Sequence, residues 1–273
     1  MKLGMPTLVE CKDLFTCCKV ARENGLDFVE INMSFPQYLS SRLDVGDINL
    51  MREQYGLAFT IHADEQLNPF DFNPAVSDCY FDVMHDTIRF AKRIGATVVN
   101  MHLLRGVYVT LPDKVILLSD VYLDEYLTRV RAFIEMCENE IGDAPLKIAI
   151  ENVDSNPFTD SQTAALELFM KREKFGLTLD TGHELCLGFA DSPVFSRYPD
   201  KLIHMHLHDA KGKSAHLPLG EGEVRAFEKL ASLPPEASCL IEVKTVRGLK
   251  RSLDFLRKNI SKHFTNKKQK KQS

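Results

Sequence analysis

The stretch LIHMHLHDAK, residues 202–211, carries three imidazoles at alternate positions inside an apolar run. Successive side chains of a β-strand point to opposite faces, so this alternation predicts a strand with His204, His206 and His208 on one face. The apolar residues between them would share the other face. Imidazoles on a buried strand need hydrogen-bond partners or a bound ion. Taken alone, the stretch leaves a hydrogen-bonded polar core and a metal site as equal alternatives.

Working outward, strand patterns alternate with amphipathic helical patterns along the chain. Besides the histidine stretch, the predicted strands cover residues 2–5, 26–31, 57–62, 97–102, 146–151, 175–180 and 238–243. The predicted helices cover residues 10–24, 47–55, 75–94, 124–139, 160–171, 193–198, 223–233 and 247–260. Eight such repeats predict an α/β fold, a (β/α)₈ TIM barrel of parallel strands.

A doubly wound open sheet is the competing fold. Such sheets usually have fewer strands, and a nucleotide-binding one has a glycine-rich first turn. Here Met5-Pro6-Thr7 follows the first predicted strand, and neither GxGxxG nor GxxxxGK[ST] occurs in the sequence. The closed barrel is therefore favoured, as a single domain over residues 1–260.

A basic tail, residues 261–273, follows the last predicted helix. Residues 258–273 hold six lysines and no acid, which leaves 28 basic against 38 acidic residues and a charge of −10 for the rest of the chain. An acidic body is a poor surface for duplex nucleic acid. We expect the tail to be solvated and disordered; a tail that binds nucleic acid is the less favoured alternative.

Seven cysteines are scattered along the chain without a CxxC pair. The sequence shows neither a signal-peptide pattern nor an apolar stretch long enough to cross a bilayer. We therefore expect a reduced, cytoplasmic protein without a membrane partner.

Ionisable residues close seven of the eight predicted strands, and all of them are Glu, Asp or His. In a parallel barrel these ends lie on one face, the face that carries active sites in this fold. Gathered acids and imidazoles would repel or titrate unless a cation lay among them, and a divalent metal removes the conflict. These residues are Glu30, His62, His102, Glu151, Asp180, His206 and Glu242.

Two further imidazoles fall in loops near the same face. His183 follows Asp180 closely, with Gly182 expected to permit the turn between them. His216 lies in the loop after the histidine strand and can fold back over the barrel mouth. His85 falls on a predicted helix away from this face, and His263 lies in the tail that follows the last predicted helix.

These segments together resemble the xylose-isomerase-like TIM barrels, a superfamily of sugar and sugar-phosphate isomerases and epimerases that also includes endonuclease IV. The resemblance runs from the first strand to the last helix. The segments that carry it are His62, His102, Ile150-Glu151-Asn152, Leu179-Asp180-Thr181-Gly182-His183, Met205-His206-Leu207-His208-Asp209-Ala210-Lys211, His216-Leu217-Pro218-Leu219-Gly220-Glu221-Gly222 and Glu242.

The isomerase and epimerase branches imply one divalent ion, Mn²⁺, Zn²⁺ or Co²⁺, held by Glu151, Asp180, His206 and Glu242. In those branches Glu151 and Glu242 also form an acid–base pair on the substrate carbon. An ion that chelates a carbonyl and its neighbouring hydroxyl would stabilise the enediolate formed by proton transfer. The resemblance thus implies a metal-dependent sugar or sugar-phosphate isomerase or epimerase.

The endonuclease IV branch implies a trinuclear zinc site and cleavage of abasic DNA. Its additional ligands match His62, His102, His183 and His216. A further aspartate ligand corresponds to Ser214, which leaves a third ion only two imidazoles. The aromatic residue that enters the DNA stack is replaced by Ala63-Asp64-Glu65, whose acids would repel phosphates.

The isomerase reading is preferred, with the endonuclease as the alternative and a non-catalytic metal-binding barrel third. We therefore expect His62, His102, His183 and His216 to bind substrate hydroxyls or a second ion. Lys211, Arg105 and Lys244 are candidates for a substrate phosphate. The expected partner is a small sugar or sugar phosphate, with nucleic acid only under the alternative; a homo-oligomer is compatible with the sequence.

Overall fold

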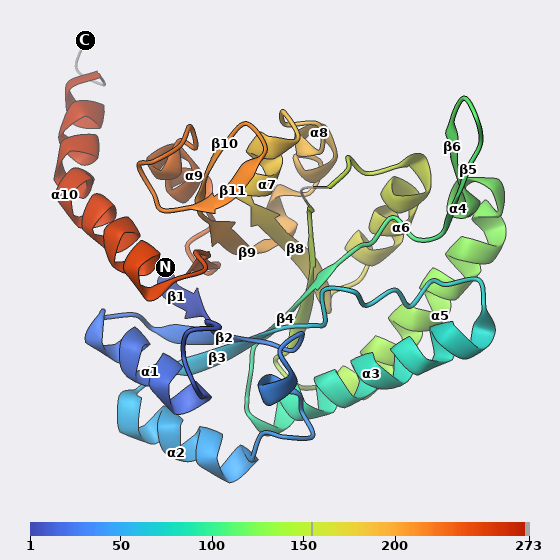
Figure 1. Cartoon of the computed structure of the whole chain (residues 1–273), viewed down its shortest axis with the longest axis horizontal. Coiled ribbons are helices and arrows are strands. Elements are labelled where there is room, and N and C mark those ends of the chain that lie inside the picture. Colours follow the sequence, from blue (N-terminus) through green and yellow to red (C-terminus); the bar gives the residue numbers. More distant parts are fainter. Residues whose placement is uncertain (154, 271–273) are drawn as a thin grey trace.

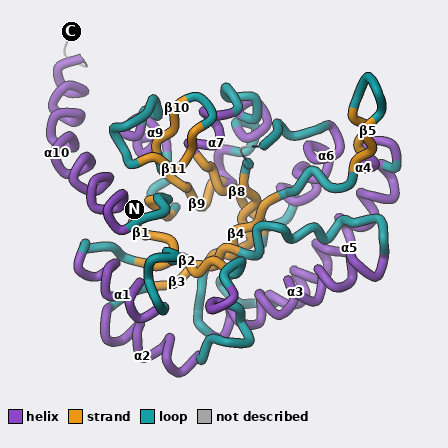
Figure 2. The backbone as a smooth tube through the Cα atoms, in the orientation of Figure 1, coloured by secondary structure: helices purple, strands orange, loops and turns teal. Residues whose placement is uncertain are grey.

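Eight parallel strands close into a barrel in the computed structural model, which describes residues 1–153 and 155–270, with side chains up to residue 259. The strands follow one another around the barrel in the order β1-β12-β9-β8-β7-β4-β3-β2, and helices surround them (Figures 1 and 2). Their bounds are β1 (Lys2–Pro6), β2 (Phe28–Asn32), β3 (Ala58–His62), β4 (Val98–His102), β7 (Lys147–Glu151), β8 (Phe175–Asp180), β9 (Leu202–Leu207) and β12 (Ser238–Ile241).

The helices begin where the sequence supplies capping side chains. Asp13 and Asp44 accept hydrogen bonds from the first turns of α1 and α2, and Thr159 forms a capping box with Gln162 at the start of α6. The helices are α1 (Leu14–Glu23), α2 (Val45–Tyr55), α3 (Pro74–Arg93), α4 (Leu118–Val121), α5 (Leu123–Ile141), α6 (Asp160–Met170), α7 (Thr181–Cys186), α8 (Ser192–Phe195), α9 (Ala226–Ser232) and α10 (Val246–Lys270).

The predicted TIM barrel is confirmed, and each predicted strand has its counterpart in the barrel. Two hairpins were not predicted. One is β5 (Tyr108–Thr110) with β6 (Val115–Leu117), which projects from the body beside α4 (Figure 1). The other is β10 (Asp209–Lys211) with β11 (Ser214–Leu217), so residues 202–211 form two strands separated at His208.

Asp209 explains why the chain leaves the barrel at that point. Its carboxylate accepts hydrogen bonds from the backbone amides of Ala210, Gly220 and Val224. A buried carboxylate with three amide donors anchors the whole loop that follows β9. The loop therefore returns over the barrel mouth instead of extending the strand.

Helix α10 runs to Lys270, past residue 260 where the sequence placed the end of the domain. It stands out from the barrel toward the C-terminus (Figure 1). The helix thus continues into this segment, and the expectation of disorder over residues 261–273 stays a prediction. Residues 271–273 lie outside the described residues, and the division into domain and tail stays a prediction.

A cluster of aromatic rings joins helices α3, α5 and α6 to the segment after β3. Phe133 of α5 is fully buried, and its ring centroid lies 5.4 Å from that of Phe70 and 5.3 Å from that of Phe81. Phe169 of α6 packs edge-on against the same ring at 6.4 Å. These contacts fix three helices on the outside of the barrel and leave its upper interior for polar residues.

None of the seven cysteines forms a disulfide. Across the described residues, every helix is too short or too polar to serve as a membrane span.

We expect Phe133→Ala to lower the free energy of unfolding by about 3–5 kcal/mol, because it removes the ring at the centre of this cluster and leaves a cavity. Urea titration followed by circular dichroism measures the change. The matched control is Val83→Ala on α3, which is 45% exposed and should change stability by less than about 0.5 kcal/mol. Equal effects of the two substitutions would contradict this view of the core.

Candidate metal centre

Four side chains that the sequence assigned to one ion meet at the C-terminal mouth of the barrel. The parallel register sets Asp180 beside His206 and His102 beside Glu151, and Glu242 follows the last residue of β12. One ligand atom from each of the four lies within 4.8 Å of the others. We call this set the ring; its members are Glu151, Asp180, His206 and Glu242.

His206 lies at the centre of the ring. Its Nδ1 atom is 3.0 Å from Glu151 Oε1, 3.1 Å from Glu242 Oε2 and 3.9 Å from Asp180 Oδ2. All four side chains are buried, the most exposed being Glu242 at 7%. Three carboxylates therefore converge on one imidazole with almost no water to screen them.

The charges in the ring indicate what kind of ion it can bind. Burial alone would raise the pKa of Glu151, but His206 and His102 bring that pKa well below its usual range. Burial acts the same way on Glu242, and Lys244 and His206 reverse it, so that its pKa also falls well below the usual range. Glu242 Oε2 is buried and accepts no hydrogen bond from a described residue. Three oxygens and one nitrogen with excess negative charge fit a divalent cation such as Mn²⁺, Zn²⁺ or Co²⁺.

Each ring member is held by a neighbour outside the ring. The Asn100 amide donates to Glu151 Oε2, and Lys244 Nζ donates to Glu242 Oε1 at 2.7 Å. The carboxylate of Asp180 also caps α7, accepting from the amide of His183 at 2.7 Å. Such outer contacts fix the ligand rotamers before any ion arrives.

A second group shares Glu151 with the ring. His62 Nε2 and His102 Nε2 lie 3.3 and 3.4 Å from Glu151 Oε2, and their rings pack edge-on at 4.9 Å. The oxygen that faces this group is not the one that faces His206. Glu151 could thus serve two ions, as the resemblance to endonuclease IV implied, or hold both imidazoles for a substrate.

A third group contains an imidazole whose role the sequence analysis did not assign. His208 joins His183 and His216, so that three imidazoles lie where only two were expected. The His216 amide donates to His208 Nδ1 at 2.8 Å, and His208 Nε2 lies 2.9 and 3.0 Å from the Asp180 oxygens. A carboxylate can only accept, so Nε2 of His208 carries a proton that it donates to Asp180, while Nδ1 also lies 3.1 Å from the carbonyl oxygen of Asp209. The alternation at 204, 206 and 208 carried the signal for this residue.

His183 and His216 keep nitrogens for other partners. His183 Nδ1 lies 3.1 Å from the carbonyl oxygen of Asn152, which leaves Nε2 for a ligand. His216 has a left-handed backbone, with φ of 56°, which is uncommon for a residue with a Cβ atom. Burial lowers the pKa of His216 to about 4, so it is neutral and can accept a hydrogen bond at physiological pH.

Gly182 has a different function from the one predicted. It lies inside α7 rather than in a turn, and a Cβ atom there would come 2.0 Å from Cε1 of His208. The glycine therefore allows the His208 ring to approach Asp180.

The prediction that Glu30 closes a strand at the mouth is wrong. Glu30 lies in the middle of β2, in register with Thr60, and contacts His206 from below the ring. Strand β2 continues to Asn32, which pairs with His62.

The candidate phosphate residues do not gather at one point. Arg105 donates to Asn156 at 3.0 Å and lies over the Tyr108 ring. Lys211 is exposed on β10 and makes no ion pair with a described residue. Lys244 is already paired with Glu242. A role for Arg105 or Lys211 in phosphate binding stays a prediction.

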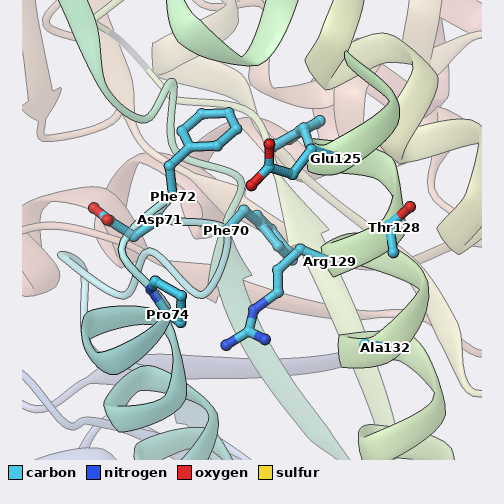
Figure 3. Close-up of a pocket in the computed structure, with 9 residues that line it drawn as sticks. Phe70, Asp71, Phe72, Pro74, Glu125, Thr128, Arg129 and Ala132 are labelled. Carbon is cyan, nitrogen blue, oxygen red and sulfur yellow. The ribbon is translucent and has the colours of Figure 1, made fainter. Parts of the chain in front are cut away.

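A separate cavity of about 250 Å³ lies between the segment after β3 and helix α5. Figure 3 shows Phe70, Phe72 and Pro74 on one side of it and Glu125 and Arg129 on the other. The Arg129 guanidinium crosses the gap to Ser77 and Asp78 of α3. This cavity shares no residue with the ring or the two histidine groups.

The barrel and the ring together define a TIM barrel built around clustered carboxylates and imidazoles. The family model of the xylose isomerase-like TIM barrel matches residues 18–259, so the chain belongs to that family.

Individual relatives extend this match across most of the chain. An uncharacterized protein of Methanocaldococcus jannaschii is 22% identical over 233 residues, which is 82% of this chain and 84% of that one. The crystal structure of a D-tagatose 3-epimerase-like protein superposes with a TM-score of 0.76 at 24% identity, covering 98% of this chain and 99% of that chain. The IolI protein, crystallised with a zinc atom, gives a TM-score of 0.67 at 15% identity, covering 97% of each chain.

We expect Gly182→Ala to weaken binding of a divalent ion by about tenfold or more, because the added methyl group forces His208 away from Asp180. Competition with a chromogenic chelator measures the affinity. The control is Leu185→Ala on the same helix, whose side chain lines a different cavity with Phe189 and Arg225. Unchanged affinity in Gly182→Ala would show that the His208 contact does not support the ring.

Metal-free protein should lose stability as the pH rises from about 6.5 to about 9. Burial lowers the pKa of His62, but Glu151 beside it raises that pKa more, from 6.5 to about 9. The folded state thus holds this proton more tightly than the unfolded state, so the contribution is complete below pH 6.5 and lost as pH passes 9. Urea titrations after chelation measure the slope. A His62→Gln variant with the wild-type slope would contradict the assignment.

Proposed function

We propose that the protein is a metal-dependent sugar or sugar-phosphate isomerase or epimerase. In this reaction Glu151 and Glu242 transfer protons to and from the substrate. The observation that carries the proposal is the pair of carboxylates that face His206 Nδ1, one from the end of β7 and one from the residue after β12, at 3.0 and 3.1 Å. Their other oxygens are held by different partners, Asn100 for Glu151 and Lys244 for Glu242. In this proposal the two acids, each held by its own partner, approach one substrate from different sides.

The chain's residues divide the work of such a reaction. One glutamate removes a proton from the carbon next to the substrate carbonyl, and the other returns a proton to the opposite face or to the neighbouring carbon. A bound divalent ion would polarise the carbonyl and hydroxyl oxygens and so acidify that carbon. His183 and His216, with free nitrogens at the mouth, orient the hydroxyl groups.

The family and the structural neighbours support this choice. The matched family is that of the xylose isomerase-like barrels, and one neighbour is described as D-tagatose 3-epimerase-like. The zinc atom of IolI supports a metal in a barrel of this shape. The cysteines, none of which is in a disulfide, support a cytoplasmic location.

A phosphodiesterase of the endonuclease IV kind is the second candidate, favoured by the imidazole pair on Glu151 and by the group of three histidines. Two observations weigh against it. The aspartate that completes the third zinc site of endonuclease IV is Ser214 here, and His208, which lies beside His183 and His216, is already bonded to Asp180. Asp64 and Glu65 follow β3, and Glu65 is held there by the amide of Asn32 at 2.8 Å, where it would repel a DNA phosphate.

We expect metal-dependent exchange of solvent deuterium into at least one member of a panel of ketoses and ketose phosphates. Glu151→Gln and Glu242→Gln should each lower the exchange rate by about 10²–10⁴-fold, because each removes one acid–base group and barely changes volume. Nuclear magnetic resonance measures the exchange. Glu140→Gln, on α5 beside His85, is the control and should leave the rate unchanged.

The same preparations should be given a duplex that carries an abasic site, with added Zn²⁺ or Mn²⁺. Efficient nicking without exchange into any sugar would overturn the proposal in favour of the phosphodiesterase. Metal content of the purified protein gives a third reading, because one ion per chain supports proton transfer and three zinc ions support phosphodiester cleavage.

A further inference from the structure

A buried carboxylate lies directly below the ring and is not one of its four members. Glu30 is 1% exposed, in the middle of β2, and its side chain points into the barrel. A buried carboxylate is costly unless hydrogen-bond donors surround it. Its neighbours therefore indicate why the barrel retains an acid at this depth.

One hydroxyl group and two imidazoles surround the carboxylate of Glu30. The Thr60 hydroxyl donates to Oε2 at 3.0 Å, and His204 Nε2 lies 3.2 Å from the same oxygen. His206 Nε2 lies 3.2 Å from the other oxygen, Oε1. Both imidazole nitrogens are buried, and neither makes a hydrogen bond of good geometry with a described residue. Glu30 is thus the one described group within reach that can accept their protons.

His206 presents its two nitrogens to opposite layers of the barrel. Nδ1 faces Glu151 and Glu242 in the ring, whereas Nε2 faces Glu30 below it. An imidazole binds a metal ion through a lone pair, so its proton must reside on the other nitrogen. A carboxylate that accepts this proton fixes the tautomer and the ring orientation and makes the ligand nitrogen more basic.

We propose that Glu30 is a positioning residue of the metal centre, which accepts the Nε2 proton of His206 and so directs the Nδ1 lone pair at the ion. This inference rests on the proposed metal-dependent function. Glu30, which lies outside the ring, would thus set the tautomer and orientation of His206, the single nitrogen ligand in the ring.

A further layer holds Glu30 in turn. His204 Nδ1 lies 2.6 Å from the hydroxyl of Ser238, the first residue of β12, and the His204 ring packs on Phe28 at 5.9 Å. The strand register sets Ser238 beside His204. With its ring fixed on both sides, His204 presents Nε2 to Glu30 Oε2. Buried contacts thus run from the ring through His206, Glu30 and His204 to Ser238.

An ion bound by Glu30, His204 and His206 themselves is the competing explanation, because their ligand atoms also lie within 4.8 Å of one another. Such an ion would need His206 Nε2 without its proton. His206 would then bridge two ions as an imidazolate, in a fully buried layer that already holds three protonatable groups. The positioning role requires no such species.

The test compares Co²⁺ binding in the wild type and in Glu30→Gln, which keeps the shape and removes the charge. We expect the affinity for Co²⁺, measured by chelator competition, to fall by about tenfold to a hundredfold. The visible absorption of bound Co²⁺ should shift, because the orientation and basicity of its nitrogen ligand change. Thr60→Val, which removes one donor to Glu30, should change both readings in the same direction by less.

Glu184→Gln is the matched control for loss of a buried acid. Glu184 is 5% exposed and is held by Ser192 and Lys229, away from the ring. This variant should lose stability while it keeps the wild-type affinity and Co²⁺ spectrum. Wild-type affinity and spectrum in Glu30→Gln would overturn the positioning role alone, provided that the wild type binds Co²⁺. A wild type that binds no Co²⁺ would overturn the metal-dependent function and this role with it.

Discussion

Three carboxylates that converge on one buried imidazole nitrogen are the constraint on which the mouth of this barrel depends. Glu151, Asp180 and Glu242 would repel one another at these distances, and little water is present to screen them. Without an ion, protonated His206 offsets part of this charge, because burial lowers its pKa but the carboxylates raise that pKa well above the usual range. A divalent cation that replaced the Nδ1 proton would offset more of it. The polar contacts around the ring hold its three carboxylates close together at the barrel mouth despite their mutual repulsion.

Each ring member has its own outer partner, and the partners come from different parts of the chain. Asn100 holds Glu151, His208 holds Asp180, Lys244 holds Glu242, and Glu30 faces His206. Gly182 contributes by its missing side chain, since only a glycine leaves room for the His208 ring. A site held this way loses little order when an ion or substrate binds.

Much of this arrangement could be predicted from the sequence. Short β-branched runs that alternate with amphipathic helices indicate a barrel, and an acid or imidazole at a strand end indicates the functional face. The four ring members are among the seven strand-end residues found on that basis, and the resemblance to the xylose-isomerase-like barrels singled them out. Their convergence follows from the parallel register, which brings strand ends together whatever their distance in the chain.

Other features could not be predicted, for identifiable physical reasons. The depth of Glu30 depends on how far β2 continues beyond it, and a strand's end is poorly defined by composition alone. The role of His208 depends on a loop that Asp209 folds back through three backbone amides, an interaction between residues up to 15 positions apart. The helix at Thr181–Cys186 forms because Asp180 caps it, although Gly182 is typical of a turn.

The choice between the two chemistries rests on the same local contacts. The third ion of an endonuclease IV site would have His183 and His216 but no aspartate at Ser214, and His208 beside them is already held by Asp180 and by the backbone of His216 and Asp209. The proton-transfer reaction needs only the ring and two carboxylates on different sides of it. The acidic residues after β3 point the same way, because they disfavour a polyanionic substrate.

The most direct measurement is anomalous diffraction from crystals grown with Mn²⁺, recorded at an energy where manganese scatters anomalously. The account predicts one dominant anomalous peak at the barrel mouth, about 2.0–2.3 Å from one atom each of Glu151, Asp180, His206 and Glu242. A map without a peak there, or one in which these four side chains turn away from a common centre, would contradict it.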